Sequence, residues 1–434
     1  MKKNKVEVSD YFRGRKPSAV RVAQLEFDKR EEEIEAINVA IGDVTLPMPL
    51  AMQKRMAALA APGSPFEKGV VHYSPTKGEP KTHETFLKII ASSGFSTEGL
   101  MVQITDGGSV GMELVILGTC DLGANLLLIE PVYTNYMALA ARTSRHTVSC
   151  RRVLEEDGSF KLPKIVEIEA LIRKHKPKAL VVLPYDNPTG SFYTQEKMVD
   201  LAKLCVKYNM WMISDEAYRE LFYTDDKVAS IWGITDQEVP GIEGRRISIE
   251  TASKVWNACG LRVGALVSDN KEFTEKCAAE YTANLCPNAI GQYIFNAIAD
   301  LPKAELRKWY EEQRRYYKKM MSSLYTEFYR LLPGIIVSKP VAALYSVLDV
   351  RNLVDKNFQA MDFVMYCARE GKVHMDGKDY TLLVAPMGGF YKVAVGEENP
   401  GRTQMRIAYV DPPEKIALVP SLFKTLFEEY LAQR

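Results

Sequence analysis

The feature that most constrains the fold is the alternation of short apolar runs with amphipathic segments through the middle of the chain. Four runs read as buried strands: LLLIEPV (126–132), ALVVLP (179–184), MWMISDE (210–216) and RISIETAS (246–253). Between two of these runs, residues 194–209 carry apolar side chains at helical spacing after Thr194, a residue type that caps helices. Strand–helix alternation of this kind predicts an α/β fold with a mostly parallel central sheet flanked by helices.

The pattern changes near residue 300. Apolar residues then recur at helical spacing until Pro333-Gly334. We expect Asp300 to cap this helix and Pro302 to lie in its first turn. A helix this long in a globular protein usually bridges two domains.

The helix divides the expected domains. Residues 335–434 mix short strands with helices, as in an α+β domain. We therefore predict a large domain over residues 54–300. The smaller domain is discontinuous and combines residues 1–53 with 301–434.

Composition excludes several classes of protein. The 56 Lys and Arg and 55 Asp and Glu residues give a net charge of +1, whereas proteins that grip nucleic-acid backbones have a clear basic excess. The seven cysteines are scattered and form no CxxC pair, and the five histidines show no ligand spacing, so we predict no metal site and no disulfide framework. The first residues lack an apolar stretch, and no uncharged run approaches the roughly 18 residues that span a membrane. We expect a cytoplasmic protein.

Polar residues follow the predicted strands. In an open α/β sheet, ligands bind beyond the carboxyl ends of the strands. Asn187 follows the run 179–184, Asp215 and Tyr218 end the next strand, and Lys254 follows the fourth. A further loop, TDGGSVG, opens a helix with Gly107-Gly108-Ser109, where free N–H groups can hold an anion.

Each of these signals also has a plain structural explanation. The Gly-Gly-Ser segment could be a simple tight turn, NPTG only a loop, Asp215 a helix cap or surface acid, and Lys254 a solvated surface lysine. Together they match one chemistry better. A lysine amine forms a Schiff base with an aldehyde cofactor, and an acid facing the ring nitrogen of pyridoxal phosphate makes that ring an electron sink.

At this point the sequence resembles a known family. The motifs, in chain order, are KPSA (16–19), AIGDVTLP (40–47), YSPTKG (73–78), TDGGS (105–109), EPVYTNY (130–136), DNPTG (186–190), SDEAY (214–218), ETASK (250–254), GLRVG (260–264), APMGGFY (385–391) and MRIAYV (405–410). They resemble the fold-type I, class I/II aminotransferases that use pyridoxal 5'-phosphate, in particular the aspartate aminotransferase-like group.

The resemblance implies roles around the cofactor ring. Lys254 is similar to the lysine that links to the cofactor and later moves the proton, and Asp215 to the partner of the ring nitrogen. Tyr218 and Asn187 match the hydrogen-bond partners of the ring's phenolic oxygen. Tyr133 matches the aromatic residue that stacks on the ring, although it could also be plain core packing.

The resemblance also implies a phosphate site and a dimer. Gly108, Ser109, Thr251 and Arg262 match the family's phosphate-binding positions. Tyr73 matches a tyrosine that reaches the phosphate from the neighbouring subunit. We therefore expect a homodimer with shared active sites.

For the substrate, Arg406 matches the arginine that clamps the α-carboxylate in a bidentate fork, with Asn187 beside it. Gly42 and Ser18 match the N-terminal segment that closes over substrate, but Ser18 could equally be a helix N-cap. Dicarboxylate-specific members carry an arginine in the stretch that here reads EYTANLCPNAIG (280–291) and has none. A cation of the N-terminal segment (Arg13, Arg15 or Arg21) could compensate, and a broader or less acidic donor is equally open.

The predicted function is transfer of the amino group of an L-amino acid to a 2-oxo acid, 2-oxoglutarate foremost, by a ping-pong mechanism. One alternative is a lyase, racemase or decarboxylase on the same scaffold, since a fold does not fix a reaction. Another is a non-catalytic regulator that binds the cofactor. The region before KPSA is only about fifteen residues, too short for a separate DNA-binding module.

Overall fold

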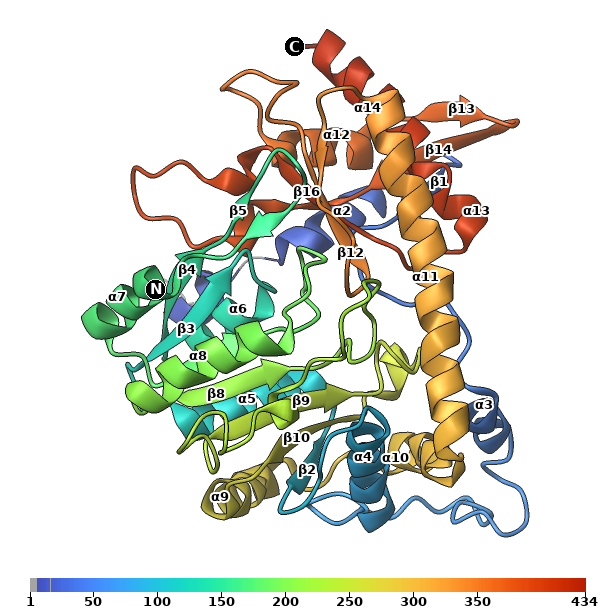
Figure 1. The fold of residues 1–434 in the computed structure, drawn as a ribbon. Helices are drawn as coiled ribbons and strands as arrows, with labels where there is room; N and C mark the ends of the chain where they lie inside the picture. The colour runs from blue at the N-terminus through green and yellow to red at the C-terminus, as the bar shows by residue number, and fades with distance from the viewer. Residues whose placement is uncertain (1–5, 16) are drawn as a thin grey trace, which may run out of the picture.

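The computed structural model describes residues 6–15 and 17–434 (Figure 1). Its largest sheet has seven strands in the order β2-β10-β9-β8-β7-β3-β4. Their bounds are β2 (Met101–Thr105), β10 (Gly264–Ser268), β9 (Arg246–Thr251), β8 (Trp211–Asp215), β7 (Ala179–Val182), β3 (Asn125–Glu130) and β4 (His146–Arg151). Only β10 runs antiparallel to its neighbours in this sheet. The four predicted strands are β3, β7, β8 and β9, and the prediction of a mostly parallel sheet is confirmed.

Helices cover both faces of this sheet. Alternate strand residues point to opposite faces, so Leu126 and Leu128 of β3 join one core cluster and Leu127 and Ile129 the other. The helices α5 (Gly108–Thr119), α6 (Asn135–Arg142) and α9 (Lys271–Tyr281) cover the first face. The helices α4 (Pro80–Ser92), α7 (Ile165–His175) and α8 (Gln195–Lys207) cover the second. Thr194 caps α8 as expected, because its hydroxyl accepts the N–H of Lys197 at 3.5 Å.

The long helix is α11 (Lys303–Leu331), and it runs along one side of the molecule (Figure 1). The expected cap at Asp300 is wrong. Pro302 occupies the N-cap position, and Asp300 ends a short 3-10 helix. The Asp300 carboxylate instead pairs with Arg55 at 2.6 Å and Lys81 at 3.3 Å. The ion pairs with these two cations take the place of the expected capping bond to the N-terminus of α11.

The C-terminal third builds two smaller sheets. One contains β11 (Ile336–Val337), β12 (Tyr345–Asp349), β16 (Gln404–Ala408) and β15 (Ala385–Pro386). The other contains β1 (Glu35–Asn38), β14 (Lys378–Leu383) and β13 (Val373–Met375). Since β1 pairs with β14, the N-terminal segment packs with the C-terminal third. The boundary between the two domains stays a prediction.

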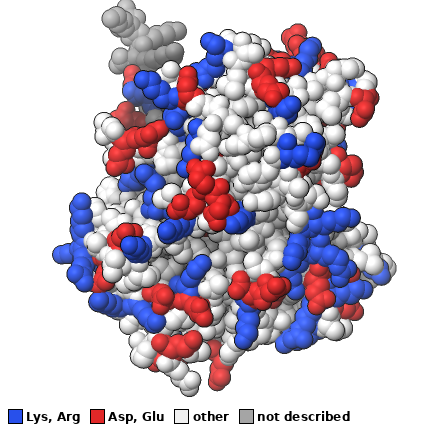
Figure 2. Space-filling model, turned by 45° about the horizontal axis from the view of Figure 1, so that its top comes forward, with Lys and Arg blue, Asp and Glu red and all other residues white. Residues whose placement is uncertain are grey.

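The remaining helices and one short hairpin lie outside the three sheets described above. They are α1 (Asp10–Arg13), α2 (Ala19–Phe27), α3 (Leu50–Ala57), α10 (Ala289–Phe295), α12 (Ala360–Arg369), α13 (Pro413–Ile416), α14 (Val419–Ala432), and the hairpin β5 (Val153–Leu154) with β6 (Phe160–Lys161). Acidic and basic side chains are interspersed over the face seen in Figure 2, as the near-zero net charge leads one to expect. In the described part of the chain, no helix is both long and apolar enough to cross a membrane.

Candidate active site

A cavity of about 960 Å³ lies where the carboxyl ends of β7, β8 and β9 face the segments around β1, β12 and β16. Twelve of the thirteen residues singled out from the sequence line it: Ser18, Gly42, Gly108, Ser109, Tyr133, Asn187, Asp215, Tyr218, Thr251, Lys254, Arg262 and Arg406. Tyr73 does not line this cavity, and it is 80% exposed. Residues far apart in sequence thus meet at the edge of the sheet where ligands bind in open α/β folds.

Asp215 is the last residue of β8 and faces the cavity. The hydroxyl of Tyr136 donates to its Oδ2, and the N–H of Ala217 donates to Oδ1 at 3.1 Å. Burial raises the pKa of Asp215, although the Tyr136 bond and the charge of Lys254 oppose the rise. The result is an oriented carboxyl group that is more basic than an exposed one.

Lys254 follows β9 and reaches across to the N-terminal segment. Its Nζ donates to the carbonyl oxygen of Gly42 and lies 3.7 Å from the Sγ of Cys259. Burial lowers the pKa of Lys254, but the neighbouring Tyr345, Cys259 and Tyr133 outweigh this effect, and its pKa is raised. A side chain at position 42 would collide with Tyr345, because an added Cβ would lie 2.1 Å from that hydroxyl oxygen.

Asn187 and Tyr218 form a hydrogen-bonded pair deep in the site. The Nδ2 of Asn187 donates to the Tyr218 hydroxyl at 3.5 Å, and that hydroxyl lies 2.7 Å from the hydroxyl of Tyr345. All three side chains are buried. Burial, followed by the influence of Tyr345, raises the pKa of Tyr218, so this phenol stays protonated.

Arg406 is a buried cation on β16 with room for one more partner. Its NH1 donates to Oδ1 of Asn187 at 3.0 Å, and its NH2 donates to the Ala40 carbonyl at 2.5 Å. Its guanidinium lies over the ring of Tyr345, 4.5 Å from the centroid. Its Nε is buried and has no hydrogen-bond partner. A buried donor without an acceptor is costly, and a ligand oxygen bound at Nε would remove that cost.

An anion cradle lies at the start of α5. Gly107 has φ 86°, a conformation that favours glycine, and the Arg262 guanidinium packs so close that an added Cβ would lie 2.3 Å from its NH2. The first N–H groups of a helix have no partner within the helix, so those at Gly108 and Ser109 can face an anion. The hydroxyl of Thr251 completes the cradle and bonds Ser253 Oγ at 2.8 Å.

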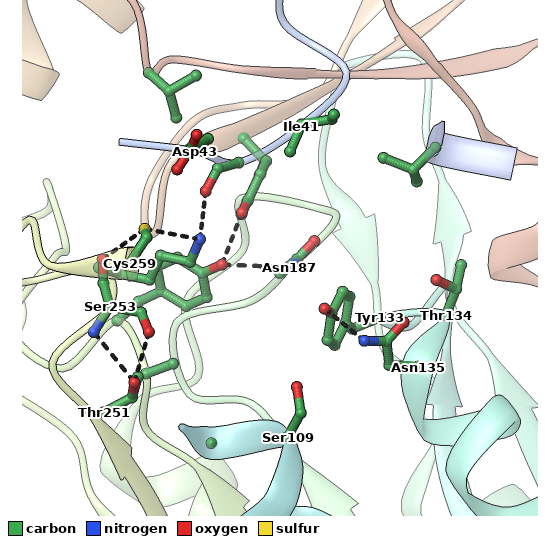
Figure 3. A pocket seen from close by; sticks show the side chains of 18 of the residues that line it. Ile41, Asp43, Ser109, Tyr133, Thr134, Asn135, Asn187, Thr251, Ser253 and Cys259 are labelled. Atoms are coloured by element: carbon green, nitrogen blue, oxygen red, sulfur yellow. Dashed lines mark hydrogen bonds between the residues drawn. The ribbon is translucent and has the colours of Figure 1, made fainter. Parts of the chain in front are cut away.

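Figure 3 shows how these groups surround the cavity. Thr251 and Ser253 lie on one side, Tyr133 and Asn135 lie opposite, and Ser109 lies between them at the base. The hydroxyl of Tyr133 accepts a bond from Asn135 at 2.8 Å, and its ring meets Tyr136 edge to face. Tyr133 is half-buried and faces the cavity, so it is more than a core residue.

The N-terminal segment contributes to the cavity mouth. Ser18 is the N-cap residue of α2, but its side chain makes no capping bond. Arg21, on the next turn, also lines the cavity. The other two candidate cations do not line it: Arg13 pairs with Glu7, and Arg15 lies over the ring of Tyr11. Lys16, the first residue of the KPSA motif, lies outside the described residues.

A buried cluster of charges lies on the other face of the sheet from Asp215. Arg219 NH2 lies 2.6 Å from Glu216 Oε2 and 2.6 Å from Glu250 Oε1. Glu216 also accepts bonds from Ser230 Oγ and the Ile231 N–H, both at 2.8 Å. Burial, partly offset by Arg219, raises the pKa of Glu216 to about 7. Because Glu216 follows Asp215 and Glu250 precedes Thr251, this cluster holds the ends of β8 and β9 together.

Three residues that contact Asp215, Lys254 or Tyr218 were not singled out from the sequence. Tyr136 lies within the quoted EPVYTNY motif, so its phenol could have been proposed as a partner for a buried acid. Cys259 lies five residues after Lys254, but a single cysteine in a sequence does not indicate any particular function. Tyr345 lies in a strand of the C-terminal third, and no local pattern marks it.

Comparison with known proteins identifies the family. The family model "Aminotransferase class I and II" matches residues 36–396, well over half of the chain. The chain belongs to this family. It is therefore a pyridoxal-phosphate-dependent aminotransferase of fold type I.

Individual relatives are distant. A probable aspartate aminotransferase of Methanocaldococcus jannaschii is 27% identical over 428 residues, which is 97% of this chain and 100% of that protein. A probable kynurenine–oxoglutarate transaminase of Saccharomyces cerevisiae is 24% identical over 296 residues, 64% of this chain and 63% of that protein. Aspartate aminotransferase from Thermus thermophilus, solved with maleate, has the same fold with a TM-score of 0.78 at 19% identity, covering 97% of this chain and 100% of that chain. The relatives are named after different amino acids, so they leave the donor open.

The cavity fits the aminotransferase cofactor. Pyridoxal phosphate needs an anion site for its phosphate, an acid for its ring nitrogen, a donor for its phenolic oxygen and an amine for its aldehyde. The cradle at α5, the oriented Asp215, the protonated Tyr218 and the Lys254 amine supply these four groups around one space. Across residues 6–15 and 17–434, no three His, Cys, Asp or Glu side chains gather as a metal site would require.

Proposed function

We propose that this aminotransferase moves the amino group of an L-amino acid to a 2-oxo acid, 2-oxoglutarate among the acceptors, in two half-reactions at one site. The observation that carries the proposal is Arg406. Its Nε is buried without an acceptor, in the same cavity as Lys254 and Asp215. Every amino acid donor and every 2-oxo acid acceptor has an α-carboxylate beside the reacting carbon, whatever its side chain. A single guanidinium can therefore hold both substrates in turn.

Arg406 orients the substrate. Its Nε and one terminal nitrogen present two parallel N–H groups to a carboxylate, a geometry that a lysine does not offer. The ring of Tyr345 and the carbonyl of Ala40 fix the guanidinium in place before substrate arrives. Pre-organisation of this kind fixes the direction of the substrate's Cα–H bond relative to Lys254.

Lys254 moves the proton. When bound, pyridoxal phosphate supplies an electron sink that makes the Cα–H bond of the attached amino acid acidic. With the cofactor bound, the Lys254 Nζ would be the group that takes the proton from the substrate's Cα and later returns it.

Asp215, Tyr218 and Asn187 set the electronic state of the ring. Asp215 would face the ring nitrogen of the bound cofactor, and a carboxylate there stabilises a proton on that nitrogen. Tyr218 and Asn187 would donate to the phenolic oxygen. Gly108, Ser109, Thr251 and Arg262 would hold the phosphate, and the ring of Tyr133 would lie beside the cofactor ring.

The donor's side chain extends toward the cavity mouth, which is lined by the cations Arg21 and Lys415 and by the acids Asp43 and Asp411. Lys415 pairs with Glu35 at 2.8 Å, whereas no ion pair of Arg21 occurs among the described residues. We infer that Arg21 favours donors with an acidic side chain over donors with a neutral one. Ser18 and Gly42 border the same space from the N-terminal segment.

Steady-state rates for aspartate, alanine, aromatic and sulfur amino acids, with 2-oxoglutarate as acceptor, test this proposal. We expect aspartate to exceed alanine in kcat/KM, and Arg21→Ala to lower that ratio roughly two- to fivefold, the loss of one weak ion pair. Arg13→Ala is the matched control, because Arg13 is exposed, pairs with Glu7 and lies outside the cavity. If Arg21→Ala leaves the ratio unchanged, Arg21 does not select the donor.

The proposed assembly is a homodimer with shared sites. Tyr73 is 80% exposed and lies beside other exposed apolar residues, Val70, Val71 and Leu285. Hydrogen bonds from Ser74 to Pro287 and from Thr76 to Leu285 hold these two segments together. If a second copy of the chain covered this surface, Tyr73 of the first copy would lie near the phosphate cradle of the second. The seven free thiols suit a reducing compartment such as the cytoplasm.

A further inference from the structure

Tyr345 belongs to a closed cycle of contacts among four side chains. Its hydroxyl bonds Tyr218 at 2.7 Å, Tyr218 bonds Asn187 at 3.5 Å, and Asn187 accepts from Arg406 at 3.0 Å. The guanidinium of Arg406 lies over the aromatic ring of Tyr345, 4.5 Å from its centroid, and this contact closes the cycle. Tyr345 and Arg406 come from β12 and β16, which pair with Val347 opposite Arg406. The other two residues lie in the loops that follow β7 and β8 of the large sheet, so the cycle of contacts joins the two parts of the site.

The number of hydrogens on the Tyr218 hydroxyl determines which residue donates in its hydrogen bond with Tyr345. Its hydroxyl has one hydrogen and two lone pairs. If that hydrogen goes to the phenolic oxygen of the cofactor, as the proposed function has it, then Tyr345 must donate to Tyr218. The contact from Asn187 is long at 3.5 Å, whereas the Tyr345 contact at 2.7 Å has normal length for hydroxyls. Tyr345 is therefore the stronger donor into Tyr218.

We propose that Tyr345 is a positioning residue that donates to the Tyr218 hydroxyl, strengthens its bond to the cofactor's phenolic oxygen, and holds Arg406 flat for the substrate carboxylate. This inference rests on the proposed function. The Tyr345 hydroxyl donates to Tyr218, and the aromatic ring of Tyr345 supports Arg406. Gly42 makes room for both, because any side chain there would displace the Tyr345 hydroxyl.

Hydrogen bonds in a chain polarise one another, so a donor into Tyr218 makes Tyr218 a better donor in turn. Better donation stabilises negative charge on the phenolic oxygen and weakens that oxygen's hold on the proton of the Lys254-linked nitrogen. The pH at which this proton leaves is then lower. Tyr345 also raises the pKa of the free Lys254 amine, so loss of its hydroxyl would by this direct effect lower that pKa, and a rise of the midpoint reports the bond through Tyr218. The other charged or titratable groups that act on Tyr218 or Lys254 are Arg406, Asp215, Cys259 and Tyr133, and none of these residues is altered when the Tyr345 hydroxyl alone is removed.

Tyr345→Phe tests the hydroxyl, and the readout is the pH midpoint of the visible absorbance of the bound cofactor, with no substrate present. We expect the midpoint to rise by roughly half to one pH unit, the size of one neutral hydrogen bond. Tyr409→Phe is the matched control. Tyr409 is equally buried, and its hydroxyl bonds Ser346 at 2.9 Å, but it does not line the cavity.

Tyr345→Leu tests the ring. It should show the same midpoint shift as Tyr345→Phe and, in addition, raise KM for the amino acid severalfold, whereas Tyr345→Phe should leave KM nearly unchanged. An unshifted midpoint in Tyr345→Phe, or an equal shift in Tyr409→Phe, would overturn the role of the hydroxyl. Equal KM in Tyr345→Leu and Tyr345→Phe would overturn that of the ring. A wild-type protein that binds pyridoxal phosphate without any visible absorbance would refute the proposed function itself, and this inference with it.

Discussion

The NH1 of Arg406 donates to Oδ1 of Asn187 across 3.0 Å, although the two residues lie 219 positions apart in the chain. Arg406 belongs to a small C-terminal sheet, and Asn187 to the loop after a strand of the large sheet. The bond therefore joins the proposed carboxylate clamp to the proposed cofactor partners. Substrate held by Arg406 is fixed relative to the groups that hold the ring.

Arg406→Lys should raise KM for the amino acid roughly 100-fold, because a lysine supplies neither the two-pronged contact nor the bond to Asn187. Cofactor binding should change much less. Steady-state kinetics, together with the visible absorbance of the purified variant, measures both. Arg402→Lys is the control: Arg402 lies outside the cavity and bonds Glu398 at 3.1 Å. Equal KM values for the two variants would argue against the clamp.

The Glu216 carboxyl predicts a pH-dependent stability. Its folded-state pKa of about 7 lies above the ordinary value of 4.5, mainly because the group is buried. Between these two pH values the folded protein keeps a proton that the unfolded chain releases, so rising pH favours unfolding. The stability that Glu216 contributes is complete below pH 4.5 and is lost as pH rises through about 7, by at most about 3 kcal/mol.

Glu216→Gln keeps the neutral form at all pH values. The free energy of urea unfolding of this variant, minus that of the wild type, should grow between pH 5 and pH 8. Glu311→Gln is the matched control, because Glu311 is exposed on α11 and its difference from wild type should stay flat. A flat difference for Glu216→Gln as well would mean that Glu216 is ionised throughout.

If Tyr73 serves the neighbour's phosphate, two inactive variants should rescue each other. A mixture of refolded Tyr73→Ala and Lys254→Ala chains contains hybrid dimers in which one site has both residues. Since about half of the dimers are hybrids with one complete site each, roughly a quarter of wild-type activity should return. The activity of each variant refolded alone is the baseline. No recovery above that baseline would place Tyr73 in its own chain's site or in none.

The residues found from the sequence share one property. Asn187, Asp215 and Lys254 follow apolar runs, and the carboxyl ends of neighbouring parallel strands converge at one edge of a sheet. Position along the chain therefore predicted position in space. The phosphate loop had a similar local signal, glycines and a serine at a helix start.

Tyr345, which sequence reasoning missed, reaches the site by packing between distant segments. Tyr345 comes to Tyr218 because β12 pairs with β16 and both pack against the N-terminal segment. No periodicity within the strand distinguishes this tyrosine from a core residue. The wrong cap at Asp300 has the same origin, because Arg55 and Lys81, from α3 and α4, decide where that carboxylate points.

The central claim is that Lys254 and Arg406 act on one amino acid at a time in a half-reaction. Purified wild-type protein loaded with pyridoxal phosphate should be mixed with a single L-amino acid and no 2-oxo acid, and the products counted per active site. The account predicts one equivalent of the matching 2-oxo acid, a change of the cofactor to its amine form, and neither event with Lys254→Ala. Continued product formation beyond one equivalent, or racemised amino acid without any 2-oxo acid, would contradict it.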